Sequence, residues 1–152
     1  MASRKISALT DHLGYWLRLV SNHVSYAFAR KLDSKGVTVA EWVVLRELYE
    51  VEALAPSRLA GNMGMTKGAI SKLADRLLGK LLIEREDVPG DGRAHTLRLS
   101  AKGRRLVPEL AGLADENDAT FFEDLSVRER AQVLQALQKI VEKKQLTDIP
   151  IS

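Results

Sequence analysis

One hairpin pattern inside a chain of helical patterns most constrains the fold. Residues 82–86 and 95–99 read as two short strands. The tip between them, Pro-Gly-Asp-Gly at residues 89–92, is turn chemistry, because glycine and aspartate tolerate sharp changes of backbone direction. On both sides of this stretch apolar residues recur at helical spacing. The sequence therefore predicts an α+β fold that is mainly helical and contains one two-stranded hairpin.

Six helices are predicted around the hairpin, over residues 9–32, 38–49, 56–63, 66–80, 102 into the 120s, and 126–144. Thr38 and Glu41 have the form of a capping box, in which the two residues satisfy free backbone donors at a helix start. Ser126 and Glu129 repeat that form before the last helix. Pro56 suits a first helical turn, because its missing N–H would have no intrahelical partner there.

Length and composition limit the class of protein. The 152 residues suit a single protomer with one core. The absence of cysteine excludes disulfides and a cysteine nucleophile, and it fits the cytoplasmic location that we expect. No run of 18 apolar residues occurs, so we expect no membrane partner. The net charge of +3 and the pI near 9.3 hint at a polyanionic partner.

The third and fourth helices have the spacing of a helix-turn-helix. Two helices that cross steeply need a small residue at their contact, a turn residue that accepts a positive φ, and an apolar anchor on the second helix. Ala60, Gly64 and Ile70 fill these three roles in order. Other helix pairs joined by a tight glycine turn share this pattern, so it does not establish DNA binding by itself.

The outward face of the fourth helix carries the residue types that read DNA. Base edges and phosphates are recognised through hydrogen bonds, so a recognition helix needs long donors and short polar groups on that face. The candidates are Thr66, Lys67, Gly68, Ser71, Lys72 and Arg76, with Arg58 on the preceding helix as a backbone contact. The alternative is an ordinary solvated face. The basic hairpin that follows, with Arg93, His95 and Arg98, favours a winged helix-turn-helix over that alternative.

Two stretches resemble the MarR (multiple antibiotic resistance regulator) family of transcription factors. They are SRLAGNMGMTKGAISKLADRLLGKLLIERE at residues 57–86 and DGRAHTLRLSAKGRRL at residues 91–106. The resemblance implies that Arg93 enters the minor groove and that Asp91 helps to position it, with His95 nearby on the wing. The narrow minor groove attracts arginine by its negative potential, and a flanking carboxylate can hold the guanidinium fork. An ordinary turn with a surface ion pair is the alternative interpretation of this tip.

One position departs from the family pattern. The family ends its recognition helix with Lys-Gly, whereas here Lys80 precedes Leu81 and the glycine comes earlier, at Gly79. A left-handed leucine costs about 1 to 2 kcal/mol, so we expect a different geometry at this helix end.

The resemblance also implies a homodimer. Residues 9–34 and 101–146 would form the dimerisation helices, and residues 37–100 the winged helix-turn-helix region. Apolar residues at both ends of the chain permit this arrangement, although a monomer can also use them as core. Two wings related by a two-fold axis would read an inverted repeat with half-sites about 34 Å apart.

Members of the family often bind small aromatic or phenolic effectors, which implies a pocket. The residues to consider are His12, Trp16, His23, Tyr26, Trp42 and Arg46, because aromatic walls with a few donors suit such ligands. Each of them alone is more typical of core or interface. His12 and His23, about 16 Å apart along one helix, do not suit a shared metal ion, so no metal and no other cofactor is expected.

The function that these patterns favour is sequence-specific regulation of transcription, with repression of an operator by a homodimer. No activated nucleophile or Gly-x-Ser-x-Gly elbow is present, so we expect no enzyme activity. Two other classes stay open: a nonspecific architectural DNA-binding protein and a helical protein-interaction module.

Overall fold

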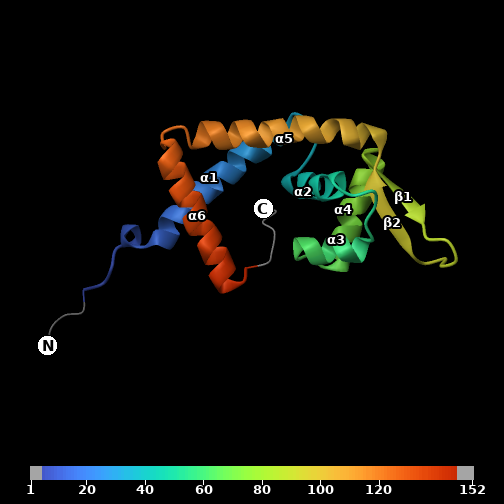
Figure 1. Ribbon diagram of the computed structural model, residues 1–152, viewed down its shortest axis with the longest axis horizontal. Coiled ribbons are helices and arrows are strands. Elements are labelled where there is room, and N and C mark those ends of the chain that lie inside the picture. The colour runs from blue at the N-terminus through green and yellow to red at the C-terminus, as the bar shows by residue number, and fades with distance from the viewer. Residues whose placement is uncertain (1–4, 147–152) are drawn as a thin grey trace.

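The computed structural model describes residues 5–146 and has the mainly helical α+β fold that the sequence predicts. Figure 1 shows the helices and the hairpin in chain order. They are η1 (Leu9–Asp11), α1 (Leu13–Asp33), α2 (Val39–Tyr49), α3 (Pro56–Met63), α4 (Lys67–Gly79), β1 (Ile83–Asp87), β2 (His95–Leu99), α5 (Ala101–Phe121) and α6 (Val127–Lys144). No helix in this part of the chain is long and apolar enough to cross a membrane.

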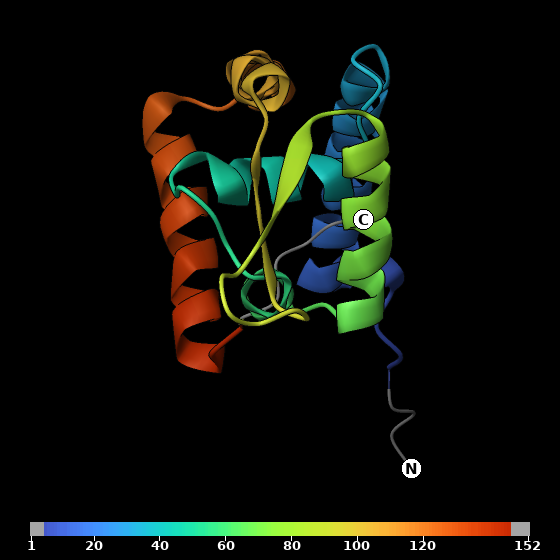
Figure 2. The ribbon, with the colours of Figure 1, turned by 90° about the vertical axis from the view of Figure 1, so that its right-hand side faces the viewer.

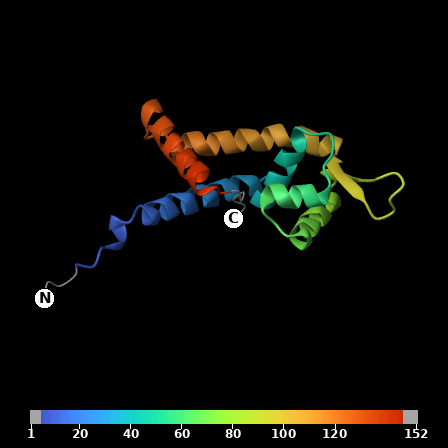
Figure 3. The same ribbon diagram turned by 60° about the horizontal axis from the view of Figure 1, so that its bottom comes forward.

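Helix α5 joins two regions of the molecule, one made of long helices and the other a compact winged region. In Figure 1, α5 runs along the top of the molecule, with α6 descending from one end and α2, α3, α4 and the hairpin gathered below the other end. Figure 3 shows α1 running beside α5, against which it packs. The long helices therefore carry a compact winged region at one end.

The hydrophobic core lies almost entirely in the winged region and under the first half of α5. Its fully buried side chains include Leu45, Leu48, Leu59, Met63, Ile70, Leu77, Leu97 and Leu110. By contrast, no residue of α6 is buried, and α1 buries only Leu32. An amphipathic helix owes most of its stability to the packing of its apolar face, so α6 lacks that packing within one protomer.

The predicted helix starts are confirmed. Thr38 and Ser126 each accept a hydrogen bond from the backbone N–H three residues on, and both capping boxes are complete. The backbone N–H of Ser126 donates to the Glu129 carboxylate, and this contact holds the pKa of Glu129 below its ordinary value. Pro56 occupies the first turn of α3 as predicted.

The prediction of one continuous helix from residue 9 is wrong at His12. Leu9–Asp11 forms a separate 3-10 turn, His12 is extended (φ −97°, ψ 127°), and α1 begins at Leu13. A local side-chain bond is compatible with this break: the Trp16 indole N–H donates to the Thr10 carbonyl at 3.0 Å, which gives that carbonyl a partner outside the regular helical pattern. His12 and His23 therefore do not share a helix, and the spacing of about 16 Å expected from one helix does not apply.

The expectation for Leu81 is also wrong, because this residue does adopt a left-handed conformation (φ 61°). The turn is a Schellman motif, in which the Leu82 N–H donates to the Leu77 carbonyl and the Leu81 N–H to the Leu78 carbonyl, both at 3.0 Å. Leu82 and Leu77 are buried beside it. These bonds and the buried leucines offset the strain of about 1 to 2 kcal/mol.

The hairpin has a regular antiparallel register that pairs Ile83 with Leu99 and Asp87 with His95. A third segment joins it, because Leu54 and Leu97 exchange two backbone hydrogen bonds of 2.9 and 2.8 Å. The sequence placed Leu54 only in the gap between the predicted helices 38–49 and 56–63. A single bridge lacks the alternating pattern that identifies a strand, so the sequence held no signal for it.

Candidate nucleic-acid interface

The turn between α3 and α4 has the geometry that a helix-turn-helix requires. Gly64 is left-handed (φ 63°, ψ 31°), and the Met65 N–H donates to the Ala60 carbonyl at 2.9 Å. Ala60 and Ile70 are both buried. The three roles assigned to Ala60, Gly64 and Ile70 are therefore confirmed.

The amphipathic pattern of α4 fixes which of its side chains face outward. Thr66 caps the helix by accepting from the Ala69 N–H at 3.2 Å, which sets the start of α4 at Lys67. Ile70, Leu73 and Leu77 are buried. The outward positions, all exposed, are Thr66, Lys67, Gly68, Ser71, Lys72 and Arg76. Within residues 5–146 none of the three cations in that set forms an ion pair, so their charges are available to phosphates.

The hairpin supplies a wing beside α4. Figure 1 shows β1 and β2 next to the helix, with the tip projecting beyond the helical body. Gly90 is left-handed at the tip (φ 83°), and Arg93 is exposed. His95 begins β2 and is half-buried. The wing therefore presents an arginine on a thin element that a groove can accommodate.

Asp91 orders the tip of the wing through hydrogen bonds with the backbone. Its carboxylate accepts a hydrogen bond from the backbone N–H of Arg93 at 3.1 Å, while its own N–H donates to the Val88 carbonyl at 3.2 Å. The carboxylate thus braces the turn that carries Arg93, and the guanidinium remains exposed.

Two other arginines of the region have different roles. Arg98 lies across from Glu84 in the sheet and forms ion pairs with Glu84 (3.2 Å) and Glu86 (3.7 Å), so its charge is used within the hairpin. Arg58 is exposed in the first turn of α3.

The predicted pocket residues do not come together in one protomer. Trp42 lines a cavity of about 260 Å³ with Val24, Phe28 and the buried Asn117, between α1, α2 and α5. Trp16 lines a separate apolar cavity of about 350 Å³ between α1 and the residues around the α5–α6 turn. His12 lies at a third site, beside Tyr15.

The three other pocket candidates, His23, Tyr26 and Arg46, line none of these cavities. The Arg30 guanidinium lies 5.8 Å from the ring centre of Tyr26, and Arg46 pairs with Glu50 at 3.2 Å. No cluster of three or more potential metal ligands occurs in the described part of the chain.

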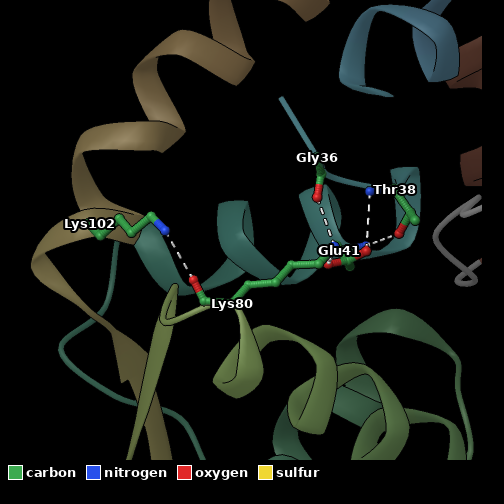
Figure 4. A network of polar contacts seen from close by, with 5 residues as sticks. All are labelled: Gly36, Thr38, Glu41, Lys80 and Lys102. Atoms are coloured by element: carbon green, nitrogen blue, oxygen red, sulfur yellow. Dashed lines mark hydrogen bonds and ion pairs between the residues drawn. The ribbon is translucent and has the colours of Figure 1, made fainter. Parts of the chain in front are cut away.

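A polar network behind the recognition helix was missed from the sequence. Figure 4 shows Lys80, at the end of α4, reaching to the start of α2. Its Nζ donates to Glu41 Oε2 at 2.7 Å and to the Gly36 carbonyl at 2.8 Å. Glu41 is 1% exposed, and its other carboxylate oxygen accepts from the Thr38 N–H. This ion pair fixes the carboxyl end of α4 against α2.

A helix-turn-helix, an unpaired cationic face and a basic wing define the class of winged helix-turn-helix DNA-binding proteins. Residues 37–95 match the model of the MarR family. A relative from Bacillus cereus, an uncharacterised HTH-type transcriptional regulator, is 29% identical over 137 residues, which cover 84% of this chain and 86% of the relative.

Two solved structures share the fold over most of their length. The S. aureus MepR–DNA complex has 25% identity and a TM-score of 0.76, covering 87% of this chain and 98% of that one. CouR from Rhodococcus jostii RHA1, bound to p-coumaroyl-CoA, has 26% identity and a TM-score of 0.75, covering 89% and 95%. The chain is therefore similar to the MarR family of DNA-binding transcriptional regulators over residues 37–95, and to winged helix-turn-helix structures over most of its length.

Proposed function

We propose that the protein is a homodimeric repressor that binds an inverted-repeat operator and responds to a small aromatic effector. The observation that carries DNA recognition is the exposed, unpaired cationic face of α4 beside the Arg93 wing. MepR, a neighbour in fold, was solved on DNA. The contacts proposed for the helix are Thr66, Lys67, Gly68, Ser71, Lys72 and Arg76, with Arg58, Asp91, Arg93 and His95 around it. Such a regulator meets its DNA in the cytoplasm, where we expect this protein.

The homodimer is supported by the apolar surface that one protomer leaves open. On α1, Leu13 is 70% exposed, and on α6 Leu134 is 55% exposed. Further exposed apolar side chains on the same helices are Trp16, Leu17, Val20, Val133, Leu137, Ile140 and Val141. Soluble monomers rarely expose contiguous apolar surface of this kind. A second copy that covers these helices would bury it.

Replacement of Leu134 by glutamate is expected to shift the protein from dimer to monomer, because a charge would have to be buried in the proposed interface. Sedimentation velocity measures the change. The control is Gln135→Glu, which adds the same charge at the next position of α6. A Leu134→Glu protein that sediments as the parent dimer would argue against this interface.

Selection of a random duplex library at near-physiological salt tests the proposed function directly. Enrichment of an inverted repeat with half-sites about one helical turn apart supports dimeric, specific recognition. Recovery of DNA without a shared motif would instead support the architectural protein. Recovery of no DNA would support the interaction module.

Arg93→Ala is expected to weaken operator binding by about 1 to 3 kcal/mol with the dimer intact, because the variant loses a groove contact. Fluorescence anisotropy on the selected duplex measures the dissociation constant. Arg128→Ala, on α6 at the opposite end of the molecule, removes the same charge and is the control. Equal affinities for both variants would refute the role given to Arg93.

The effector site that we propose is the cavity beside Trp42. Phe28 and Trp42 meet edge to face, with ring centres 6.4 Å apart, and Asn117 adds a polar group that is bonded to the Val24 carbonyl at 3.3 Å. An apolar cavity with few polar groups suits an aromatic ligand. CouR was solved with a ligand that contains an aromatic acyl group. His12, Trp16, His23, Tyr26 and Arg46 lie outside this cavity and stay secondary candidates.

A further inference from the structure

Another cavity, of about 580 Å³, lies where three segments of the chain meet. These are the turn between α1 and α2, the end of α4, and the first turns of α5. The side chains that give it its charge are Lys35, Lys80, Lys102, Arg105 and Glu109. It is separate from the cavity beside Trp42, with which it shares no lining residue.

The cations of this cavity outnumber their carboxylate partners. Lys35 pairs with Glu109 at 3.4 Å, and Lys80 pairs with the buried Glu41. Within residues 5–146, the Lys102 side chain forms one hydrogen bond, to the Lys80 carbonyl at 3.3 Å. Arg105 is exposed and has no ion pair in the same part of the chain. Two positive charges therefore face the cavity without a carboxylate, which favours an anion that carries two negative charges.

The cavity also has an apolar wall. Leu81, Leu82 and Leu106 line it, and Leu81 is 68% exposed although its backbone is left-handed. A strained non-glycine residue that exposes an apolar side chain at a cavity is typical of a functional position. The wall has room for an organic group beside the charged one, because the cavity is far larger than a bare phosphate or sulfate ion.

This anion is not the phosphate backbone of bound DNA. Most of the DNA-reading residues of α4, from Thr66 to Lys72, lie in its first half, whereas the cavity lies at its carboxyl end, about one turn beyond Arg76. Figure 2 shows that end of α4 beside the start of α5 and the α1–α2 turn, on the opposite side of the winged region from α3.

We propose that this cavity binds a small organic molecule with a dianionic head group, of the phosphomonoester class. Arg105 and Lys102 hold the head group, and the leucine wall contacts the organic part. Arg105 suits this role because its planar fork donates two hydrogen bonds to one phosphate group. Bound ligand would touch Gly79 to Leu82, the segment that links the recognition helix to the wing.

Calorimetric titration of the full chain with phenyl phosphate tests the binding. The pH is set above the second pKa of the phosphate, about 6, so that the probe is a dianion. Phenyl sulfate, which has the same shape as phenyl phosphate but only one negative charge, is the control ligand. We expect saturable binding of phenyl phosphate that is at least about tenfold tighter than that of phenyl sulfate.

The variant Arg105→Gln is expected to weaken phenyl phosphate binding about tenfold or more, while Arg128→Gln leaves it unchanged. Circular dichroism checks that both variants keep the fold. Absence of saturable binding, equal affinity for the two probes, or equal affinity of Arg105→Gln and the parent would each overturn the proposal.

The expected effect of the ligand on operator binding rests on the proposed function and is measured in a separate experiment. Phenyl phosphate should change operator affinity in the parent and not in Arg105→Gln. The titration itself contains no DNA, so a failure of ligand binding and a failure of DNA recognition give different results. If phenyl phosphate binds without any change in operator affinity, the anion site is supported and its coupling to the recognition helix α4 is refuted.

Discussion

Replacement of Gly103 by alanine is expected to destabilise the protein by about 2 to 3 kcal/mol, a typical cost of forcing an atom into a filled site. Gly103 is buried in the first turn of α5, where an added Cβ would collide with the carbonyl oxygen of Leu82. That carbonyl accepts from the Ser100 N–H at 3.0 Å, so it has little freedom to move. The collision would push apart the start of β1 and the start of α5.

Gly112→Ala, in the same helix, is the control. A Cβ at Gly112 meets nothing within 4 Å, and alanine is a better helix former by about 1 kcal/mol. Urea denaturation followed by circular dichroism should therefore give a lower midpoint for Gly103→Ala and an equal or higher midpoint for Gly112→Ala. If both alanine variants are stabilised alike, the close approach of Leu82 to Gly103 is not a feature of the protein.

The fold was predictable because its local signals agree with one another. The caps at Thr38, Thr66 and Ser126 mark helix starts through bonds between residues three apart, so sequence spacing alone identifies them. The Pro-Gly-Asp-Gly tip determines the hairpin in the same local way. His12 shows the limit of such reasoning, because apolar spacing continues through it while its backbone is extended and the regular helix begins only at Leu13.

The outward face of α4 was predictable for a related reason. The buried face of α4 follows from its apolar spacing, and the remaining positions must then face outward. What the sequence could not show are partners that are distant along the chain. Leu54 meets Leu97, and Lys80 meets Glu41, only after the tertiary fold has formed.

Leu81 illustrates how tertiary contacts override a local preference. Its left-handed conformation costs about 1 to 2 kcal/mol, which led us to expect another geometry. The Ser100 hydroxyl, however, donates to the Leu81 carbonyl at 2.7 Å across the hairpin. A bond between residues 19 positions apart cannot be inferred from the sequence of the turn.

Replacement of Lys80 by methionine is expected to destabilise the protein by about 2 to 3 kcal/mol, because it leaves the buried Glu41 carboxylate without its cation. The effect should fall below that of a fully buried pair, since the Lys80 side chain is 39% exposed and solvent screens its charge. Lys72→Met, at an exposed and unpaired position of the same helix, is the control, with an expected change within about 0.5 kcal/mol. Urea denaturation measures both changes.

A second substitution separates the ion pair from the loss of the lysine stem. Glu41→Gln keeps an oxygen that can accept from the Thr38 N–H and removes the buried charge. If the unpaired carboxylate causes the loss, the double variant Lys80→Met with Glu41→Gln should be more stable than Lys80→Met alone by about 1 kcal/mol or more. Additive effects in this double-mutant cycle would mean that Lys80 acts through its packing and its bond to Gly36. Lys80→Met should also weaken operator binding at temperatures where the variant is still folded. Lys80 joins the end of the recognition helix to α2, so its loss would let that helix end move relative to the wing.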